Sequence, residues 1–548
     1  MAHVFHENLP EHNILEAEGG SVAEYKRRAG RWLLNQGDAA AEVLIRTTMS
    51  VLLLLVSILC LILVVLYLQF RWRHRHILAT ANKLPCPPAW PFIGNALFFV
   101  GDITSITKNI IKFTTQFKGL FSIWVGPVPV FVASDPSDVQ IILNSSNTLE
   151  KDVVYHFLRP FIGNGLLTAP VVIWKKYRRL ISPVLHPSNV EQYLSVFNDV
   201  SKDLVDKLAS GTEEIEPTND IFHTAVDAVM KIIGARNRLS SQTKENIIYL
   251  LDWGGKMFIG RLFKVWLHVD WIYYLLCGKE FKKAMKRYVA CIDVLDQEWK
   301  NEENMRNLDP ESNQNYGTEA FPGKSLLDVC FEFPPDGSEE HDWKDELMTM
   351  IVGATDTVVA ALSFLLVTLA NYPEVQTKIQ AEIHEVIGDS RGDVTLSDLN
   401  SLTYLGHAIM ESMRLHGIFP VIVRRATRDT KLSVCTLPAG SRILIPLHAM
   451  GWHENQFPHP EKFMPERFAP DMQQESGTKR HMYAFLPFSA GPRSCIGKTY
   501  AMMMMKTVMV HILRRFTVNT QVRMEDIEYE LKVVMFSKTP LLLKFNPR

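Results

Sequence analysis

The sequence predicts a mainly α-helical protein, with one large helical domain, a small β portion and a single N-terminal transmembrane helix. Three observations support this prediction. Helical periodicity dominates the chain after Asn95, short β-rich pieces occur at 120–134 and 442–450, and residues 49–70 form an uninterrupted apolar run. No repeat or flexible linker divides the long C-terminal part, so we expect one domain over 95–548.

The apolar run MSVLLLLVSILCLILVVLYLQF predicts a membrane anchor, because about 20 apolar residues span the hydrocarbon core as a helix. The 48 residues before the run are too many for a cleaved signal peptide. Four basic residues between Arg71 and Lys83 follow it, whereas only Arg46 lies close before it; such an excess marks the cytosolic side. The predicted order on the endoplasmic reticulum membrane is a lumenal extension (1–48), the anchor (49–70), a basic and proline-rich linker (71–94) and a cytosolic domain (95–548).

A second apolar stretch, 346–372, is also long enough to cross a membrane. Asp356 lies near its centre between Thr355 and Thr357. An acid inside a membrane costs about 2.5–3.5 kcal/mol, so a central helix through a protein core is favoured over a second span. The acid and its neighbouring hydroxyl then indicate where a cavity meets this helix.

Two other segments have distinctive compositions. Residues 261–287 are aromatic-rich with basic flanks, which is compatible with contact with a bilayer and equally with ordinary core packing. The polar run 301–320 predicts a surface loop.

The cysteines indicate one special thiol. Seven are scattered without metal-finger spacing, and the net charge of −1 gives no basic footprint for a nucleic-acid partner. Cys495 alone lies in a distinctive frame, FLPFSAGPRSCIG. A nucleophile needs a nearby base and zinc needs three or four protein ligands, whereas haem iron needs a single proximal thiolate.

The neighbours of Cys495 fit a haem ligand. Gly491 and Gly497 allow a tight turn against a porphyrin, Arg493 can pair with a propionate, and Phe488 can pack beneath the ring. A helix that starts beside the sulfur helps to stabilise a thiolate.

The pattern Phe488-x-x-Gly491-x-Arg493-x-Cys495-x-Gly497 resembles the haem-binding loop of the cytochrome P450 family. Further motifs of that family occur in the expected order from about residue 84 to the end, and the resemblance implies the cytochrome P450 fold. They are Trp174 and Arg178 with Arg424, which resemble propionate-binding residues; GATDTV (353–358), which resembles the oxygen-handling segment; and Glu411, Arg414 and Arg467, which resemble a structural charge network.

This resemblance implies a haem-thiolate monooxygenase that carries haem b and inserts one oxygen atom from O2 into a lipophilic substrate, such as a fatty acid, a hormone-like lipid or a xenobiotic. It also implies that Thr357 and Asp356 supply protons. Electrons are expected from NADPH through NADPH–cytochrome P450 reductase, with cytochrome b5 as a second donor. Lys498, Lys506 and the basic cluster at 282–287 are candidate charges for steering that partner.

Three positions depart from the family pattern. Ala354 replaces the usual glycine, Val358 replaces a threonine or serine, and Gly353 stands where many related fatty-acid hydroxylases carry a glutamate that esterifies haem. We therefore expect haem without an ester, and oxidation of bulky substrates at subterminal or ring positions. Two alternatives remain open: a relative that rearranges peroxides without a reductase, and a catalytically silent haem protein in the membrane.

Overall fold

The structure is a computed structural model that describes residues 22–90, 92–209, 213–234, 239–308, 326, 329, 343–470 and 480–548. The chain divides into two compact units, with the boundary between Arg75 and His76. Residues 1–21 of the expected N-terminal extension lie outside the described part.

In the described part of the first unit, the main element is one long helix, α1 (Val22–Arg73). Its segment Leu44–Arg73 is long and apolar enough to cross a membrane, and none of its most apolar stretch is buried inside the protein. The predicted anchor at 49–70 lies within this segment. The helix begins well before the anchor, so residues 22–48 of the expected extension are helical too.

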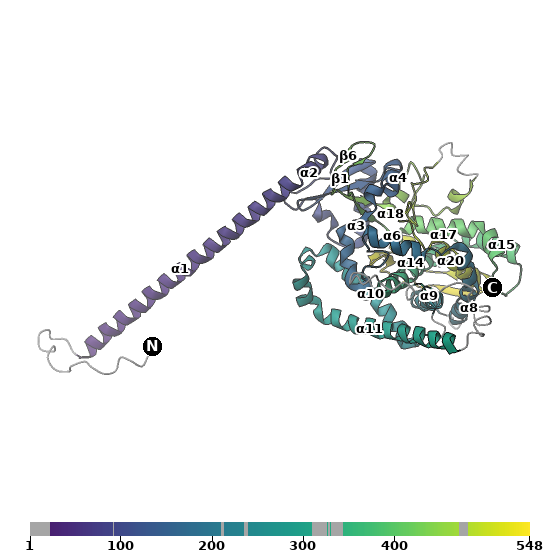
Figure 1. The fold of residues 1–548 in the computed structure, drawn as a ribbon, viewed down its shortest axis with the longest axis horizontal. Helices are drawn as coiled ribbons and strands as arrows, with labels where there is room; N and C mark the ends of the chain where they lie inside the picture. The colour runs from purple at the N-terminus through teal and green to yellow at the C-terminus, as the bar shows by residue number, and fades with distance from the viewer. Residues whose placement is uncertain are drawn as a thin grey trace. The chain divides into compact units, whose positions relative to one another are not determined.

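The second unit is the helical body (Figure 1). Its long helices surround α14 (Trp343–Asn371), which packs against α9, α17 and α20. The other α-helices are α2 (Arg75–Ala81), α3 (Ile103–Phe117), α4 (Pro136–Asn144), α5 (Arg159–Ile162), α6 (Val171–Ile181), α7 (Pro187–Val190), α8 (Leu194–Leu208), α9 (Thr218–Ile233), α10 (Ser241–Phe263), α11 (Asp270–Leu308), α15 (Pro373–Ile387), α16 (Leu396–Ser401), α17 (Thr403–His416), α18 (Leu447–Gly451) and α20 (Lys498–Arg515). Short 3-10 helices are η1 (Ala96–Phe99), η2 (Ser146–Thr148), η3 (Val153–Leu158), η4 (Glu191–Tyr193), η5 (Val265–His268), η6 (Pro465–Phe468) and η7 (Met524–Asp526).

The β portion is a five-stranded sheet with three two-stranded ribbons. The sheet order is β1-β2-β7-β4-β3, with β2 and β7 parallel and the other pairs antiparallel. Its strands are β1 (Leu120–Val125), β2 (Val128–Ala133), β3 (Glu150–Lys151), β4 (Ile422–Arg425) and β7 (Arg442–Ile445); the ribbons pair β5 (Thr430–Lys431) with β6 (Thr436–Leu437), β8 (Phe516–Asn519) with β11 (Lys544–Pro547), and β9 (Tyr529–Leu531) with β10 (Met535–Ser537). The β-rich pieces predicted at 120–134 and 442–450 therefore form the sheet, although 447–451 turns into α18.

The second apolar stretch is a core helix, as expected. Most of the apolar part of α14 is buried inside the body, including Asp356 and Thr355. Its apolar residues cover all sides of the helix because neighbouring helices surround it, which is the pattern of a buried helix.

The linker predicted at 71–94 needs correction. From His76 this segment belongs to the body: α2 buries Ile77, Leu78 and Ala81. The proline-rich part is tied to the sheet by Asn95, whose buried amide donates to the carbonyls of Pro87 at 3.0 Å and Pro88 at 2.9 Å. Prolines cannot donate backbone hydrogen bonds, but their carbonyls can accept, so a proline-rich strip can pack into a domain.

The loop predicted at 301–320 is wrong for its first eight residues, because α11 continues to Leu308. Residues 309–320 lie outside the described part. Residues 301–308 are polar by sequence, and polarity alone does not separate a polar stretch of helix from a loop.

Candidate haem site and charge network

The loop before α20 presents the Cys495 side chain. The N–H of Cys495 donates to the carbonyl of Phe488 at 2.9 Å, which closes the loop. Ser489 and Gly491 have φ angles of 57° and 72°, in the left-handed region. A Cβ at Gly491 would also clash with the carbonyl of Leu143, so glycine is required there on two grounds.

Gly497 behaves differently from Gly491. Its φ is −91° and a Cβ would lie 3.9 Å from the Cys495 sulfur, an ordinary contact. Within the protein chain alone, residue 497 could therefore carry a side chain, and any need for glycine there comes from what binds against the loop.

The Cys495 side chain lies on the wall of an internal cavity. Its surface is accessible through this cavity, although protein surrounds it on its other sides. Burial raises the pKa of its thiol, while the Gly497 N–H, Arg178 and Lys498 act in the opposite direction. A free thiol is thus favoured over a free thiolate here. A metal cation at the sulfur would reverse that balance, because a coordinating thiol is deprotonated.

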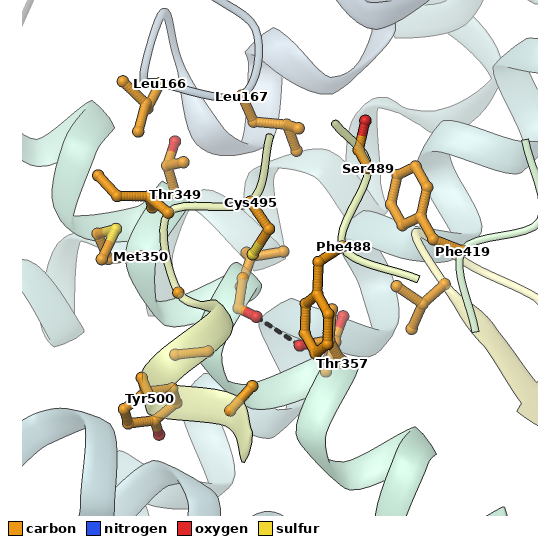
Figure 2. A pocket seen from close by; sticks show the side chains of 18 of the residues that line it. Leu166, Leu167, Thr349, Met350, Thr357, Phe419, Phe488, Ser489, Cys495 and Tyr500 are labelled. Atoms are coloured by element: carbon orange, nitrogen blue, oxygen red, sulfur yellow. Dashed lines mark hydrogen bonds between the residues drawn. The ribbon is translucent and has the colours of Figure 1, made fainter. Parts of the chain in front are cut away.

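The cavity lies between α14, the cysteine loop and α20 (Figure 2). Cys495, Phe488 and Thr357 surround the same space, and most of the remaining wall is apolar. Leu166, Leu167, Met350, Phe419 and Tyr500 are among the other lining residues.

Three cations gather at one end of this cavity: Lys151, Arg424 and Arg493, which we call the cation cluster. Lys151 and Arg424 pair across β3 and β4. Burial, followed by the charge of Arg424, lowers the pKa of Arg493 to about 10, and burial also lowers the pKa of Lys151 and Arg424. Three positively charged side chains are thus held close together in a part of the protein that is shielded from solvent.

Several hydrogen-bond donors of the cation cluster have no acceptor among the described residues. Nη1 of Arg424, and Nε and Nη1 of Arg493, are buried without a hydrogen-bond partner among the described residues. Arg493 does stack on Trp174, with 4.4 Å from Cζ to the ring centroid, and donates to Ala169 O at 3.1 Å. Buried donors without acceptors are costly, so this arrangement favours an anionic ligand.

A haem group fits these residues. Its propionates would satisfy the cation cluster, its iron would meet the Cys495 sulfur and its macrocycle would contact the apolar walls. Arg178 is already committed to the loop, since it donates to Ser494 O at 2.8 Å. Lys151 was not anticipated from the sequence; no local motif marks it, and only the pairing of β3 with β4 brings it here.

On α14, Thr357 and Asp356 both line the cavity. The Thr357 hydroxyl donates to Gly353 O at 2.7 Å, and the Asp356 Oδ1 is buried without a partner among the described residues. Burial raises the pKa of Asp356 to about 7, with Lys532 opposing and Asp252 reinforcing the shift. A carboxyl with that pKa can both release and regain a proton near neutral pH.

The helix remains α-helical through 353–358 despite Ala354 and Val358. A Cβ built on Gly353 meets nothing within 4 Å. Gly353 therefore lies beside open space in the cavity wall.

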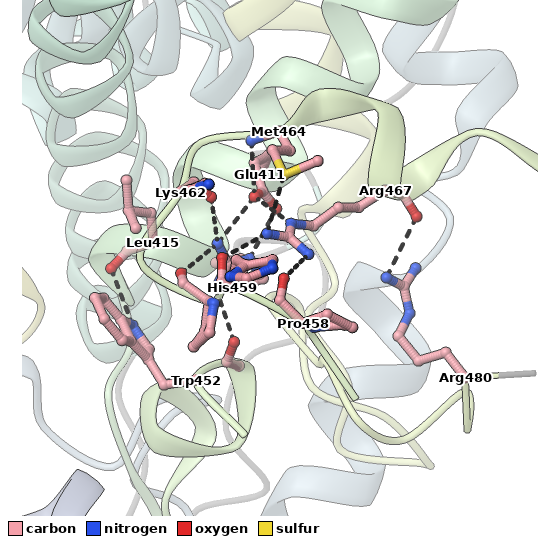
Figure 3. Close-up of polar contacts among 12 residues, drawn as sticks. Glu411, Leu415, Trp452, Pro458, His459, Lys462, Met464, Arg467 and Arg480 are labelled. Carbon is pink, nitrogen blue, oxygen red and sulfur yellow. Dashed lines mark hydrogen bonds and ion pairs between the residues drawn. The ribbon is translucent and has the colours of Figure 1, made fainter. Parts of the chain in front are cut away.

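Glu411, Arg414 and Arg467, which we call the paired network, form a hydrogen-bonded group that is not part of the cavity lining. Figure 3 shows Glu411 and Arg467 in this group. Arg414 binds both carboxylate oxygens of Glu411, at 2.8 and 2.9 Å, and Arg467 Nε donates to Glu411 Oε1 at 3.0 Å. The remaining donors of Arg414 reach backbone carbonyls, including Gly451 O at 2.9 Å. The network joins α17 to η6 and the segment before it.

Lys506, expected to steer a redox partner, is used internally. Its ammonium donates to Leu399 O at 2.7 Å and Leu402 O at 2.8 Å, which ties α20 to α16. Lys498 is exposed and stays a candidate.

The fold and the site define a haem protein in which a single cysteine thiolate would hold the iron. Comparison with known families gives the same result: the cytochrome P450 family model matches residues 84–545, and the chain belongs to that family. It is therefore a haem b monooxygenase, in which the haem bound by the thiolate activates O2 and electrons originate from NADPH through a redox partner.

Similar proteins include human cytochrome P450 4V2, 30% identical over 479 residues that cover 84% of this chain and 89% of the relative. Cytochrome P450 4d2 of Drosophila melanogaster is 31% identical over 451 residues, covering 79% and 88%. Cytochrome P450 4c3 of the same species is 28% identical over 486 residues, covering 85% and 90%.

Proposed function

We propose that this monooxygenase oxidises bulky lipophilic substrates at subterminal or ring carbons, and that its haem carries no ester to the protein. The open wall at Gly353 is the observation that carries this proposal. An ester requires a carboxylate beside the macrocycle, and residue 353 has no side chain to supply one.

The same feature bears on substrate shape. With nothing within 4 Å of a Cβ at Gly353, the cavity has room beside the helix for a wide substrate. A narrow channel selects chain ends because only a terminal methyl reaches the iron, so a wider one admits attack further along the chain or on a ring. The mostly apolar lining favours lipophilic substrates.

The site residues take the following roles in this proposal. Cys495 would hold the haem iron, with Phe488, Gly491 and Gly497 shaping its loop, and Thr357 and Asp356 would move protons on the cavity face of α14. Arg493, Arg424, Trp174 and Arg178 hold the propionate side of haem, and Lys151 joins them.

NADPH–cytochrome P450 reductase, with cytochrome b5 as a second donor, is the proposed source of electrons. Arg178 anchors α6 to the cysteine loop, and the exposed cations Lys175, Arg179 and Lys498 lie on α6 and at the start of α20. A positive surface beside the buried thiolate would attract an acidic redox protein.

The proposed location is the endoplasmic reticulum membrane, with the body in the cytosol. Within 261–287, Trp266, Trp271, Leu275 and Leu276 are exposed, which favours contact of this segment with a bilayer. Tyr273 and Arg261 in the same segment are buried, so its other face packs into the body.

Three measurements test the proposal. The reduced CO complex of the wild type should give the red-shifted Soret band of a thiolate ligand, and Cys495→Ser should lose it because serine is not a soft anionic ligand. Acidified organic solvent should extract the haem, and purified reductase with NADPH should give subterminal or ring products. Haem that stays on the polypeptide, or a strong terminal-carbon preference on fatty acids, contradicts the proposal.

A further inference from the structure

The turn between β9 and β10 forms part of the cavity wall. Val533 and Val534 line the cavity, and Lys532 precedes them on the turn. The backbone N–H of Lys532 donates to Val534 O at 2.9 Å, which makes the turn tight. Displacement of Lys532 would therefore move both valines.

Lys532 ties this turn to α10. Its ammonium lies 2.7 Å from Oδ1 of Asp252 and 3.5 Å from Oε2 of Glu530, and its side chain is only 17% exposed. The other oxygen of Asp252 is bound by Lys256 at 2.7 Å. Asp252 is thus held on its own helix and presents one oxygen to the turn.

The surface of α10 is shaped for this contact. A Cβ on Gly255 would lie 2.6 Å from the Cβ of Lys532, closer than real side chains approach. Glycine at this position lets the stem of Lys532 lie directly against the helix. The ion pair between Lys532 and Asp252 therefore forms where the turn packs directly against α10, and not across a layer of solvent.

The opposite side of the turn is held by the backbone. Met535 N–H donates to Ile418 O at 2.9 Å, and Ile418 is itself a lining residue. The charge of Lys532 also opposes the rise in the pKa of Asp356 that burial causes, so it acts on the polar part of the cavity. Of the two attachments, the ion pair is the one that a change of side chain can release.

We propose that Lys532 is a positioning residue for specificity: its ion pair with Asp252 holds Val533 and Val534 against the substrate and so sets which carbon is presented. The inference rests on the proposed function, in that the cavity is taken to hold the substrate. Release of the pair would let the turn separate from α10, which weakens substrate binding and broadens the set of oxidised positions.

The test uses Lys532→Met and Asp252→Asn in the full-length, haem-loaded protein. Substrate affinity is measured by the spectral shift on titrating a branched or cyclic hydrocarbon probe, and positional selectivity by product analysis with NADPH and purified reductase. Each variant should raise Kd about fivefold, equivalent to about 1 kcal/mol, and spread the products over more positions. The double variant should be no worse than either single one, since both remove the same pair.

Two controls separate positioning from general damage. Lys532→Arg keeps the charge and should restore both Kd and the product pattern. Lys538→Met removes a surface pair with Glu528 (2.7 Å, lysine side chain 63% exposed), just beyond the same ribbon, and should change neither.

An unchanged Kd and product pattern in Lys532→Met, with a normal CO spectrum, overturns the inference and leaves the monooxygenase proposal intact. Loss of haem from both Lys532→Met and Asp252→Asn also overturns it, because the pair then supports the fold and not the substrate. Absence of the predicted products from the wild type contradicts the proposed function instead, while the titrations still report on the ion pair.

Discussion

The body contains two groups of buried cations that differ in how far their charges are satisfied. In the paired network, Glu411 accepts hydrogen bonds from both Arg414 and Arg467, and the remaining donors of Arg414 reach backbone carbonyls. In the cation cluster, Arg424 and Arg493 keep buried donors without acceptors, and no ion pair joins the cluster to an acid within the described residues. The hydrogen-bond donors of the paired network are satisfied by the protein itself, whereas those of the cation cluster are satisfied only when an anionic ligand binds.

This difference separates structure from binding. A fully satisfied buried network rigidifies a fold, and a partly satisfied one is costly until its partner arrives. The comparison therefore predicts that similar substitutions in the two places change the free energy of unfolding with opposite signs.

Arg414→Met should have the largest effect. It leaves Glu411 charged, fully buried and with only part of its partners, which costs about 3–5 kcal/mol when one member of a buried pair is removed. We expect little soluble, haem-loaded protein, measured by expression, haem content and the free energy of unfolding. Stable, haem-loaded Arg414→Met would show that the network is dispensable.

Arg424→Met should have a smaller effect of opposite sign on the protein without haem. The change removes a buried cation with an unpaired donor, so the apoprotein should gain about 1–3 kcal/mol in unfolding free energy. The same variant should release haem faster, because a propionate loses its partner. A less stable apoprotein, or unchanged haem release, would contradict the ligand-binding assignment of the cluster.

The members of the two groups are not equally predictable from the sequence, because some lie close to their partners in the chain and others do not. Glu411 and Arg414 lie three residues apart on one helix, a spacing that places them on the same face and makes their pairing predictable. The cysteine loop is equally local: its motif predicts a haem site, and the structure places Cys495 on the wall of a cavity. Arg467 and Arg424 were identified only by the family resemblance, since no periodicity brings them to their partners.

Lys151 and Lys532 show what the sequence could not predict. Lys151 reaches the cavity through a two-residue strand, and Lys532 reaches Asp252 across the fold. Such contacts depend on tertiary packing of segments far apart in the chain. The end of the linker was placed too late for a related reason. A proline-rich run is typical of a rigid spacer, and the sequence does not show that the carbonyls of Pro87 and Pro88 accept hydrogen bonds from Asn95.

Acidification should weaken the region around the paired network. Burial, before the charges of His448 and Arg414, lowers the pKa of His416 to about 3, and burial likewise lowers that of His448 to about 4. Both are below the unfolded value of about 6.5, so the folded state favours the neutral rings. The stability they contribute is fully present above pH 6.5 and is lost as pH falls toward 4.

The measurement is the unfolding free energy between pH 7.5 and about 5, where each buried histidine adds up to about 1.4 kcal/mol per pH unit. His416→Gln should flatten this dependence, whatever its effect at pH 7.5. An unchanged slope in that variant would mean that the ring binds as many protons in the folded protein as in the unfolded chain, so that burial does not lower its pKa.

Of these variants, Thr357→Ala should change the free energy of unfolding least. Its main effect should be on how NADPH consumption is coupled to product formation. Among the described residues the hydroxyl donates to Gly353 O at 2.7 Å, a helix carbonyl, so its loss should alter the unfolding free energy by about 0.5 kcal/mol or less. NADPH consumption should continue, while less product and more hydrogen peroxide form, because the cavity face of α14 loses the hydroxyl that would hold a proton in place. The matched control is Thr355→Ala: Thr355 lies on the same helix and is buried, but does not line the cavity. A fall in the ratio of product to NADPH in Thr357→Ala alone places proton transfer on the cavity face of α14, whereas a fall in Thr355→Ala, or none in Thr357→Ala, moves that role to another group.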